Sequence, residues 1–535
     1  MNHKQNKGMT KSVTWQNFQQ HYLDLPELGI ALDTSRMNVP DKLPNELEML
    51  FRNAFQQMEN LEKGGIANPD ENRMVGHYWL RNPELAPSQD IQTVISSTLE
   101  KIQNFVAEIH QNKIQPQKAA SFQNVLLLGI GGSTLGPQFV ISALGSGTDR
   151  MQFYFIDNTD PDGIDQLMAS IGKGLGETLT LVISKSGGTK ETRNAMLEVR
   201  DVYEKNGLDF TKHAVAVTGA NSQLDQLAAK ENWLDCFPMW DWVGGRTSVF
   251  SAVGLLPAAL QGLNIYEFLA GAKKMDEITR SPEVSNNPAA LLAWMWHHAG
   301  RGQGEKAMVL LPYKDRLLFF SRYLQQLVME SIGKEKDLVG KKVNQGLTVY
   351  GNKGSTDQHA FVQQLRDGTD NFFVTFIEVL KDRENKSLDV EPGVTSGDFL
   401  QGFLLGTREA LFQNGRTSLT ITLEIINTQT LGALIALFER TVGLYAFLVG
   451  INAYHQPGVE SGKQAAGNVL ELAVKIQHHL RSHPEQKFTA TELADILQKT
   501  INTETVFQLL LHLAANNRVQ KFEAKSPFSA SFQAI

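Results

Sequence analysis

Short apolar runs alternate with longer amphipathic stretches from about residue 124 onward. Four strongly apolar runs come first, each followed by a polar or glycine-containing turn, at 125–128, 151–156, 179–183 and 214–217. Four more runs follow the same pattern, at 308–311, 347–350, 372–377 and 419–423. Apolar runs of this length, separated by helix-length segments, are typical of parallel strands that helices cover on both faces.

This alternation predicts an α/β fold class, with two doubly wound parallel-sheet domains and additional helices at both ends of the chain. Most of the first 120 residues and of 430–480 have helical patterns, and we expect both to pack around the second sheet. Ser281-Pro282 and Asn287-Pro288 mark a connection between the domains. The predicted organisation is an N-terminal helical segment on the large domain, a smaller α/β domain, a larger α/β domain and a C-terminal extension, over 1–120, 121–285, 286–483 and 484–535.

The composition fits a large globular protein. Hydrophobic residues make up 42% and charged residues 20% of the 535 residues, which excludes a disordered or low-complexity chain. The net charge of −7 argues against nucleic-acid and membrane-surface partners. A single cysteine, Cys236, excludes an internal disulfide and a CxxC site. The start of the chain has no signal-peptide pattern, and the apolar run 442–451 is too short to span a bilayer, so we expect a cytoplasmic protein.

Two loops at predicted strand ends are rich in glycine and hydroxyl groups. The first, 129–133, reads Gly-Ile-Gly-Gly-Ser, but Thr134 breaks the GxGxxG pattern, and the chain has no Walker A sequence, so a nucleotide cofactor is disfavoured. The second, 184–189, reads Ser-Lys-Ser-Gly-Gly-Thr and opens into a helix. It fits either a phosphate cradle at a helix N-terminus or an ordinary N-capped turn. Two such loops on neighbouring strands favour a phosphate without a nucleoside.

Two charged residues have positions suited to catalysis. Arg246 follows two glycines, so it is either a stabiliser of developing negative charge or a solvated arginine after a flexible turn. Glu330 lies in the last turn of a helix predicted over 317–334, with Gln326 on the same face. A carboxylate at the negative end of the helix dipole has a raised pKa, which suits a general base, although an exposed helix glutamate also fits.

Two further positions carry candidate chemistry. His359 follows a glycine-rich strand end, and Lys463 stands where a new helix begins, shortly after Gln456. The adjacent pairs His297-His298 and His478-His479 diverge on a helix, and HExxH is absent, so no metal site of this type is indicated.

Taken in order, these motifs resemble the glucose-6-phosphate isomerase family over about residues 60–480. The sequence departs from the family at Ile332, where asparagine is usual, and this removes a polar group beside Glu330. Upstream, Asn68, Glu71, Arg73, His77 and Leu80-Arg81 resemble the family's helical entry motif. The other motifs that carry the resemblance are 129–133, 184–192, 243–246, 329–334, 357–359 and 458–463.

The resemblance implies sugar-isomerase α/β domains and the reversible conversion of glucose 6-phosphate to fructose 6-phosphate, in glycolysis and gluconeogenesis, without cofactor or metal. It implies a homodimer whose active sites lie at the subunit interface. Glu330 would move a proton through a cis-enediol intermediate, Arg246 would stabilise its charge, and His359, reaching the neighbouring subunit's site, and Lys463 would serve ring opening. The implied substrate-binding residues are Gly132, Ser133, Ser184, Lys185, Ser186, Thr189, Gln326 and Gln456.

Two other functions are open to a chain of this kind. A sugar-phosphate-binding regulatory protein would keep the serine-rich cradle, but it would not need Arg246, Glu330, His359 and Lys463 together. A DNA-binding regulator would use the tail, where 489–492 has the pattern of a helix start, yet the tail's basic residues are sparse. The joint presence of the four charged residues favours the enzyme.

Overall fold

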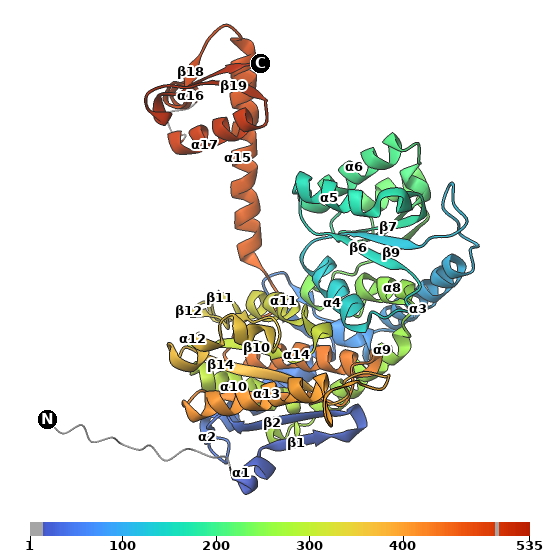
Figure 1. Ribbon diagram of the computed structural model, residues 1–535, viewed down its shortest axis with the longest axis vertical. Coiled ribbons are helices and arrows are strands. Elements are labelled where there is room, and N and C mark those ends of the chain that lie inside the picture. Colours follow the sequence, from blue (N-terminus) through green and yellow to red (C-terminus); the bar gives the residue numbers. More distant parts are fainter. Residues whose placement is uncertain (1–13, 498–501) are drawn as a thin grey trace, which may run out of the picture. The chain divides into compact units, whose positions relative to one another are not determined.

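The computed structural model describes residues 14–497 and 502–535, apart from the side chains of 459–461, 463 and 464. The chain divides into two compact units (Figure 1). The first runs to His455 and the second comprises Gln456–Ile535.

The first unit contains a five-stranded parallel sheet. Its strand order is β6-β5-β7-β8-β9, so β5, the first of these five along the chain, lies between β6 and β7. The four apolar runs predicted here as strands are confirmed, whereas β9 escaped detection because it is short and begins with a charged residue. The strands are β5 (Asn124–Leu128), β6 (Gln152–Ile156), β7 (Thr178–Ile183), β8 (Ala214–Thr218) and β9 (Asp235–Pro238). The helices between them are α4 (Leu135–Leu144), α5 (Pro161–Ile171), α6 (Lys190–Lys205) and α7 (Gln223–Glu231).

The second sheet of this unit has six strands in the order β1-β2-β17-β14-β10-β13. The four apolar runs predicted for it form its parallel strands, β10 (Ala307–Pro312), β13 (Val349–Tyr350), β14 (Phe372–Val379) and β17 (Ser418–Leu423). The other two, β1 (Tyr22–Leu25) and β2 (Ile30–Arg36), form a hairpin that pairs antiparallel with β17.

That hairpin was not predicted within the segment 1–120, whose described part is otherwise mainly helical, as expected. Six of the seven residues of β2 are buried, but three of the six are the polar residues Asp33, Thr34 and Ser35. Asp33 is held by Arg408 at 2.5 Å and accepts a hydrogen bond from the Ser35 amide at 2.9 Å. Because these polar residues interrupt the run, the sequence lacks the apolar pattern of a buried strand.

Helix α14 (Thr428–Leu448) is the central helix of the first unit. It is long and apolar enough to cross a membrane, but 94% of its most apolar stretch is buried inside the protein, as in the core helix of a soluble protein. It packs most extensively against α9 (Ile265–Thr279). A Cβ atom built on Gly432 would lie 2.1 Å from the carbonyl oxygen of Phe268, so the two helix backbones approach closely only because residue 432 is glycine. The other helices around this core are α2 (Asn45–Glu62), α3 (Gln89–His110), α8 (Ala252–Gln261) and α10 (Pro288–Gly300).

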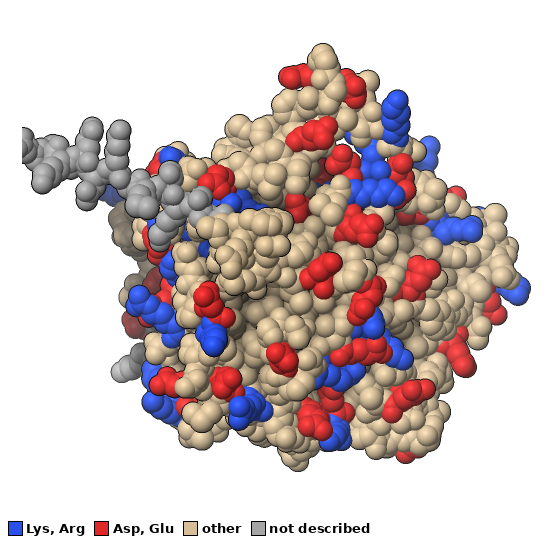
Figure 2. Space-filling view, turned by 90° about the horizontal axis from the view of Figure 1, so that it is seen from below, with Lys and Arg blue, Asp and Glu red and all other residues tan. Residues whose placement is uncertain are grey.

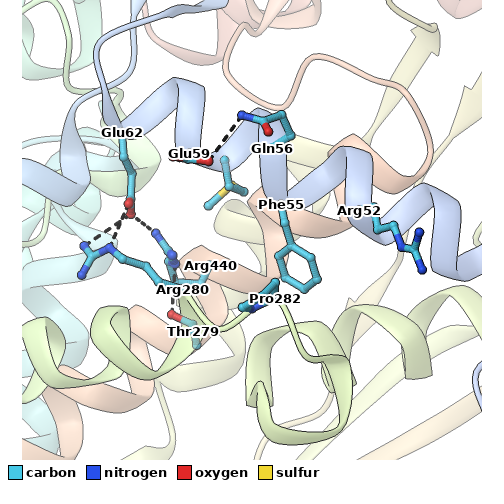
Figure 3. Close-up of a pocket in the computed structure, with 10 residues that line it drawn as sticks. Arg52, Phe55, Gln56, Glu59, Glu62, Thr279, Arg280, Pro282 and Arg440 are labelled. Carbon is cyan, nitrogen blue, oxygen red and sulfur yellow. Dashed lines mark hydrogen bonds and ion pairs between the residues drawn. The ribbon is translucent and has the colours of Figure 1, made fainter.

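Buried ion pairs tie these helices together. Arg81 has a fully buried side chain and binds Asp276 of α9 at 2.6 Å and Glu439 of α14. Glu62, at the end of α2, accepts hydrogen bonds from Arg280 at 2.9 Å and from Arg440 (Figure 3). The two guanidinium groups lower the pKa of Glu62 against the opposing effect of its burial. The same residues form one wall of a cavity of about 470 Å³.

The surface charges of the first unit are mixed on the face that Figure 2 shows, where acidic and basic side chains are interspersed. This face offers no extended basic surface of the kind that nucleic-acid binding needs.

The second unit has a core of its own, to which the C-terminal half of α15 (Pro457–Ser482), two shorter helices and a small three-stranded sheet contribute. The predicted helix start at 489–492 is confirmed, since the side chains of Thr489 and Glu492 each accept a hydrogen bond from the other's backbone amide. The two helices are α16 (Ala490–Leu497) and α17 (Thr503–Ala515), and the sheet has the strand order β18 (Phe488–Thr489), β20 (Ser531–Ala534) and β19 (Val519–Phe522).

The buried ion pairs lead to a stability prediction. Substituting Arg81→Met leaves Glu439 buried without its cation and Asp276 with only the longer contact to Arg440 at 4.0 Å, which costs about 3–5 kcal/mol of unfolding free energy. Urea unfolding followed by circular dichroism measures this loss. The matched control is Arg52→Met, because the Arg52 side chain is 80% exposed and its loss is expected to cost less than about 0.5 kcal/mol. Equal unfolding midpoints for the two variants would contradict the prediction.

Candidate active site

Two glycine loops meet at the centre of the candidate site. A Cβ atom built on Gly132 would lie 1.9 Å from the carbonyl oxygen of Gly245, so only glycine fits at position 132. Gly132 belongs to a 3-10 turn, Gly131–Ser133, directly after β5, and Gly245 opens a second such turn, Gly245–Thr247. The contact therefore places Arg246 beside the loop that carries Ser133.

Arg246 and Glu330 form an ion pair. The distance from Nη1 of Arg246 to Oε2 of Glu330 is 3.2 Å, and the Arg246 side chain is only 7% exposed. Nη2 of Arg246 donates a hydrogen bond to the carbonyl oxygen of Ala453 at 2.8 Å, which fixes the guanidinium group from the other side. Burial lowers the pKa of Arg246 and the Glu330 carboxylate opposes this effect. An arginine remains a cation under these conditions, so the site holds a buried positive charge next to a carboxylate.

The helix that carries Glu330 is not α-helical throughout. Within the predicted range 317–334 the structure has α11 (Phe320–Leu324) followed by a π-helical turn, Gln325–Glu330, and the prediction is too long because Lys334 already begins strand β11 (Lys334–Lys336). A Cβ atom built on Gly131 would lie 3.0 Å from Nε2 of Gln326, so this amide borders the glycine loop. Wider turns of this type occur frequently at functional sites. The π turn thus carries both Gln326, at the glycine loop, and Glu330, at Arg246.

Lys334 lies beside the site, and sequence reasoning did not select it as a functional residue. Its buried Nζ donates hydrogen bonds to the carbonyl oxygens of Glu330 at 2.7 Å and Ser331 at 2.9 Å. It therefore caps the end of the helix that presents the carboxylate. Burial and the nearby charge of Arg246 lower the pKa of Lys334 to about 7. A lysine inside a recognised motif is visible in the sequence, but its burial is not.

The hydroxyl groups of the second loop lie close together. Oγ of Ser184 donates to Oγ1 of Thr189 at 3.4 Å, and the hydroxyl of Ser186 accepts a hydrogen bond from the Gly188 amide at 3.2 Å. Thr189 is the N-cap residue of α6, and its side chain makes no capping hydrogen bond. The hydroxyl groups are thus gathered at a helix N-terminus, where an anion is favoured.

Lys185 connects this loop to the one that carries Arg246. Its Nζ donates hydrogen bonds to the carbonyl oxygens of Asp241 and Val243, each at 3.2 Å. Burial lowers the pKa of Lys185, although the Asp241 carboxylate opposes this effect. The three loops that contain Ser133, Ser184 and Arg246 are therefore joined by direct contacts.

The structure does not bring every predicted residue to this site. His359 is exposed at the end of a 3-10 turn, Thr356–His359, whereas Glu330 and Arg246 pair with each other in other segments. Its loop is well fixed, because the buried Asp357 accepts hydrogen bonds from the backbone amides of Asn352 and Lys353 at 2.7 and 3.1 Å. Gln456 is the N-cap residue of α15 in the second unit. Lys463 belongs to the same helix, and its side chain lies outside the described residues.

The motif upstream of the site, residues 68–81, contacts the segment that binds Arg246. Its residues form a short hairpin, β3 (Ile66–Asn68) with β4 (Arg73–Met74), and a 3-10 turn, His77–Leu80, so the expected helical entry is largely a hairpin. Oδ1 of Asn68 accepts a hydrogen bond from the side-chain amide of Asn452 at 2.9 Å. This contact anchors the segment that provides the Ala453 carbonyl to Arg246.

Ile332 does not point toward the polar site. Its side chain is fully buried in the hydrophobic core of the first unit. The replacement of the family's usual asparagine therefore adds a core contact behind Glu330.

The residues of the site include no metal-binding cluster. Within 14–497 and 502–535, no group of three or more His, Cys, Asp or Glu residues could hold a metal ion.

Comparisons with known proteins identify the family of this chain. The sequence model of the family described as phosphoglucose isomerase matches residues 33–487. The chain belongs to the phosphoglucose isomerase family. It is 60% identical over 508 residues to a glucose-6-phosphate isomerase of Geotalea daltonii, with 95% of this chain and 96% of the relative covered.

Two further relatives of the phosphoglucose isomerase family extend the comparison. A glucose-6-phosphate isomerase of Geobacter sulfurreducens is 60% identical over 525 residues, with coverage of 98% and 99%. A crystal structure of the enzyme from Chlamydia trachomatis has a TM-score of 0.78 at 27% identity, covering 86% of this chain and 91% of that one. The high coverage of the Geobacter sulfurreducens relative shows that this relative also contains a counterpart of the C-terminal extension.

Lys334 leads to a prediction on pH dependence. Between about pH 7 and pH 10 the folded protein has lost the Lys334 proton while the unfolded chain retains it, so this residue makes unfolding free energy rise with pH. Urea unfolding at several pH values should therefore show a shallower rise for Lys334→Met than for the wild type. Lys336→Met, at an exposed position in the same short strand, is the control and should follow the wild type. Parallel curves for all three proteins would refute the prediction.

Proposed function

We propose that Glu330 is the base with which this chain interconverts glucose 6-phosphate and fructose 6-phosphate. The chain is an aldose-ketose isomerase of the phosphoglucose isomerase family. The observation that carries the assignment is the Arg246–Glu330 pair, at 3.2 Å, next to two hydroxyl-rich loops. An isomerisation of this type needs one base that reaches two adjacent carbons and one cation beside the developing negative charge. The pair provides both within one site.

In this mechanism the Glu330 carboxylate removes the proton from C2 of the opened sugar and returns it to C1. The intermediate is a cis-enediol, and its oxygen carries negative charge as the proton leaves. The guanidinium group of Arg246, held by the Ala453 carbonyl, lies beside the carboxylate and stabilises that charge. Because the protein fixes the cation before the reaction begins, little reorganisation is needed during proton transfer.

The phosphate group of the substrate is bound at the amino end of α6. Its donors are the hydroxyl groups of Ser133, Ser184, Ser186 and Thr189, with the Lys185 ammonium group behind them. Gly132 keeps this loop against Arg246, and the Gln326 amide is placed to contact a sugar hydroxyl. Anchoring the phosphate there positions the carbon chain across the Arg246–Glu330 pair.

We also propose a homodimer in which His359 serves the partner's site. The exposed face of α13 (Ser396–Gln413) carries Phe399 and Phe403, which are 36% and 46% exposed and whose rings lie 6.2 Å apart. Gln358, directly before His359, donates a hydrogen bond to the carbonyl oxygen of Phe403 at 3.3 Å. Large exposed apolar side chains mark interaction surfaces. A second copy seated on this face would therefore meet His359.

The remaining roles follow the family resemblance. His359 and Lys463 would act in ring opening, and Gln456 would orient a sugar hydroxyl. A location in the cytoplasm is proposed on the same basis, supported by the single cysteine. A regulatory protein that only binds sugar phosphates is not favoured, because such a protein has no use for a carboxylate paired with a buried arginine.

The first functional prediction concerns the base. Glu330→Gln keeps the shape of the side chain but removes proton transfer, so kcat should fall by a factor of about 10²–10⁴. Binding of inorganic phosphate, measured by calorimetry, should be retained because its donors lie in other loops. Glu335→Gln, at an exposed position five residues away, is the matched control and should keep full activity. Activity of Glu330→Gln within threefold of wild type would assign the proton transfer to another group.

The second prediction concerns the shared site. Glu330→Gln and His359→Ala, each nearly inactive alone, are unfolded and refolded together. Random mixing makes about half of the dimers mixed, and one of the two sites in each mixed dimer then has native Glu330 and native His359, so roughly a quarter of wild-type activity should return. If His359 acted within its own chain, every site would keep one lesion. Mixed dimers confirmed by mass but without activity would therefore exclude the shared site.

A further inference from the structure

The six-stranded sheet has a topological switch point that the proposed reaction does not use. From β10 the chain first passes to β13 on one side and then crosses to β14 on the other. The five-stranded sheet has the same arrangement around β5, and the proposed phosphate donors follow β5 and β7 there. Open parallel sheets bind ligands outside the carboxyl ends of the strands at such points. The equivalent position in the larger sheet is where β10 and β14 end.

A cavity of about 290 Å³ lies at this position. Its walls come from the segments that directly follow β10, β14 and β17. Ile425 and Ile426 form an apolar wall just before the N-terminus of α14. Four cations outnumber two carboxylates in the lining, and the charged residues are Lys314, Arg316, Lys381, Asp382, Arg383 and Glu384.

Lys314 holds the two main walls together. From the segment after β10, its Nζ donates hydrogen bonds to the carbonyl oxygens of Lys381 at 2.9 Å and Asp382 at 2.5 Å, both in the segment after β14. The ammonium group is thus fixed in place by the backbone of the facing segment. A cation that is already positioned binds an anion at a lower entropic cost than a mobile one.

The cations of the cavity are not fully neutralised. Lys381 is paired with Glu384 at 2.8 Å, but Arg383 makes no hydrogen bond or ion pair with any residue of the described chain. The pKa of Lys314 is lowered first by burial and then by the charges of Arg316 and Arg383, against the effects of Asp382 and Asp315. Three like charges therefore repel one another around one cavity, and a bound anion would relieve this repulsion.

We propose that this cavity is a second anion site, which binds the phosphate group of a small phosphate monoester. Its volume lies just below the range for drug-sized ligand pockets, roughly 300–1,000 Å³, so it suits a three-carbon phosphate ester better than a nucleotide. None of its lining residues belongs to the loops after β5 and β7, so it is separate from the phosphate cradle of the substrate.

The test is calorimetric titration of the full-length protein with glycerol 3-phosphate. We expect two equivalents to bind per chain. Ser184→Ala combined with Thr189→Ala should weaken one site, and Arg383→Glu should weaken the other by about tenfold or more, since a charge-assisted hydrogen bond is replaced by repulsion. KM for glucose 6-phosphate should change less than twofold in Arg383→Glu, because that residue does not touch the cradle.

The control is Lys386→Glu, which makes the same charge change at an exposed position of the same segment, outside the cavity lining. Arg383→Lys, which keeps the positive charge, should retain most of the second binding event. A single equivalent that is lost in the Ser184→Ala/Thr189→Ala variant and kept in Arg383→Glu would overturn the proposal, as would equal binding by Arg383→Glu and Lys386→Glu. Thermal unfolding of each variant verifies that the fold is intact, as expected for a residue that is exposed and unpaired.

Discussion

The close approach of Gly132 to Gly245 is the constraint on which the site depends. It joins the loop after β5 to the loop that carries Arg246, with no room for a side chain between them. Lys185 adds a second link, because it binds two carbonyl groups just upstream of Arg246. The loop proposed to bind phosphate and the cation proposed to stabilise the intermediate are therefore joined through the backbone, so in the proposed mechanism the backbone sets the distance between the phosphate and Arg246.

Around this contact, the rest of the first unit acts as support. Arg246 is held by the Ala453 carbonyl, and the segment containing Ala453 is anchored to Asn68 through Asn452. Behind it, buried ion pairs join α2, α9 and α14, which carry Glu62, Asp276 and Glu439. A buried pair contributes little net stability by itself, since desolvation offsets much of the attraction. Its directional bonds nevertheless fix how these helices pack, and so fix the position of the segment that holds Arg246.

The sequence was sufficient to predict a strand wherever the strand is a continuous apolar run. All eight runs proposed as parallel strands are strands in the structure, since burial on both faces demands apolar residues throughout. The prediction of strands failed where buried polar groups are paired with one another, as for Asp33 and Arg408 in and beside β2. Arg246 and Glu330 could be selected from motifs, but the carbonyl of Ala453 could not, because any residue provides one. Lys334 shows the same limit: its pKa of about 7 arises from burial, which no local pattern encodes.

The place of β2 in the larger sheet also bears on how this protein acquires its fold. Leu32, near the start of the chain, pairs with Ile421, so β2 has no permanent neighbour on that side until β17 has been synthesised. Until then the hairpin of β1 and β2 exposes an unpaired edge, of the kind that invites pairing with other chains. The five-stranded sheet, by contrast, is complete once residue 238 has emerged. The smaller sheet can therefore assemble early in synthesis, whereas the larger one closes only after residue 423, and during that interval the growing chain is most prone to aggregation.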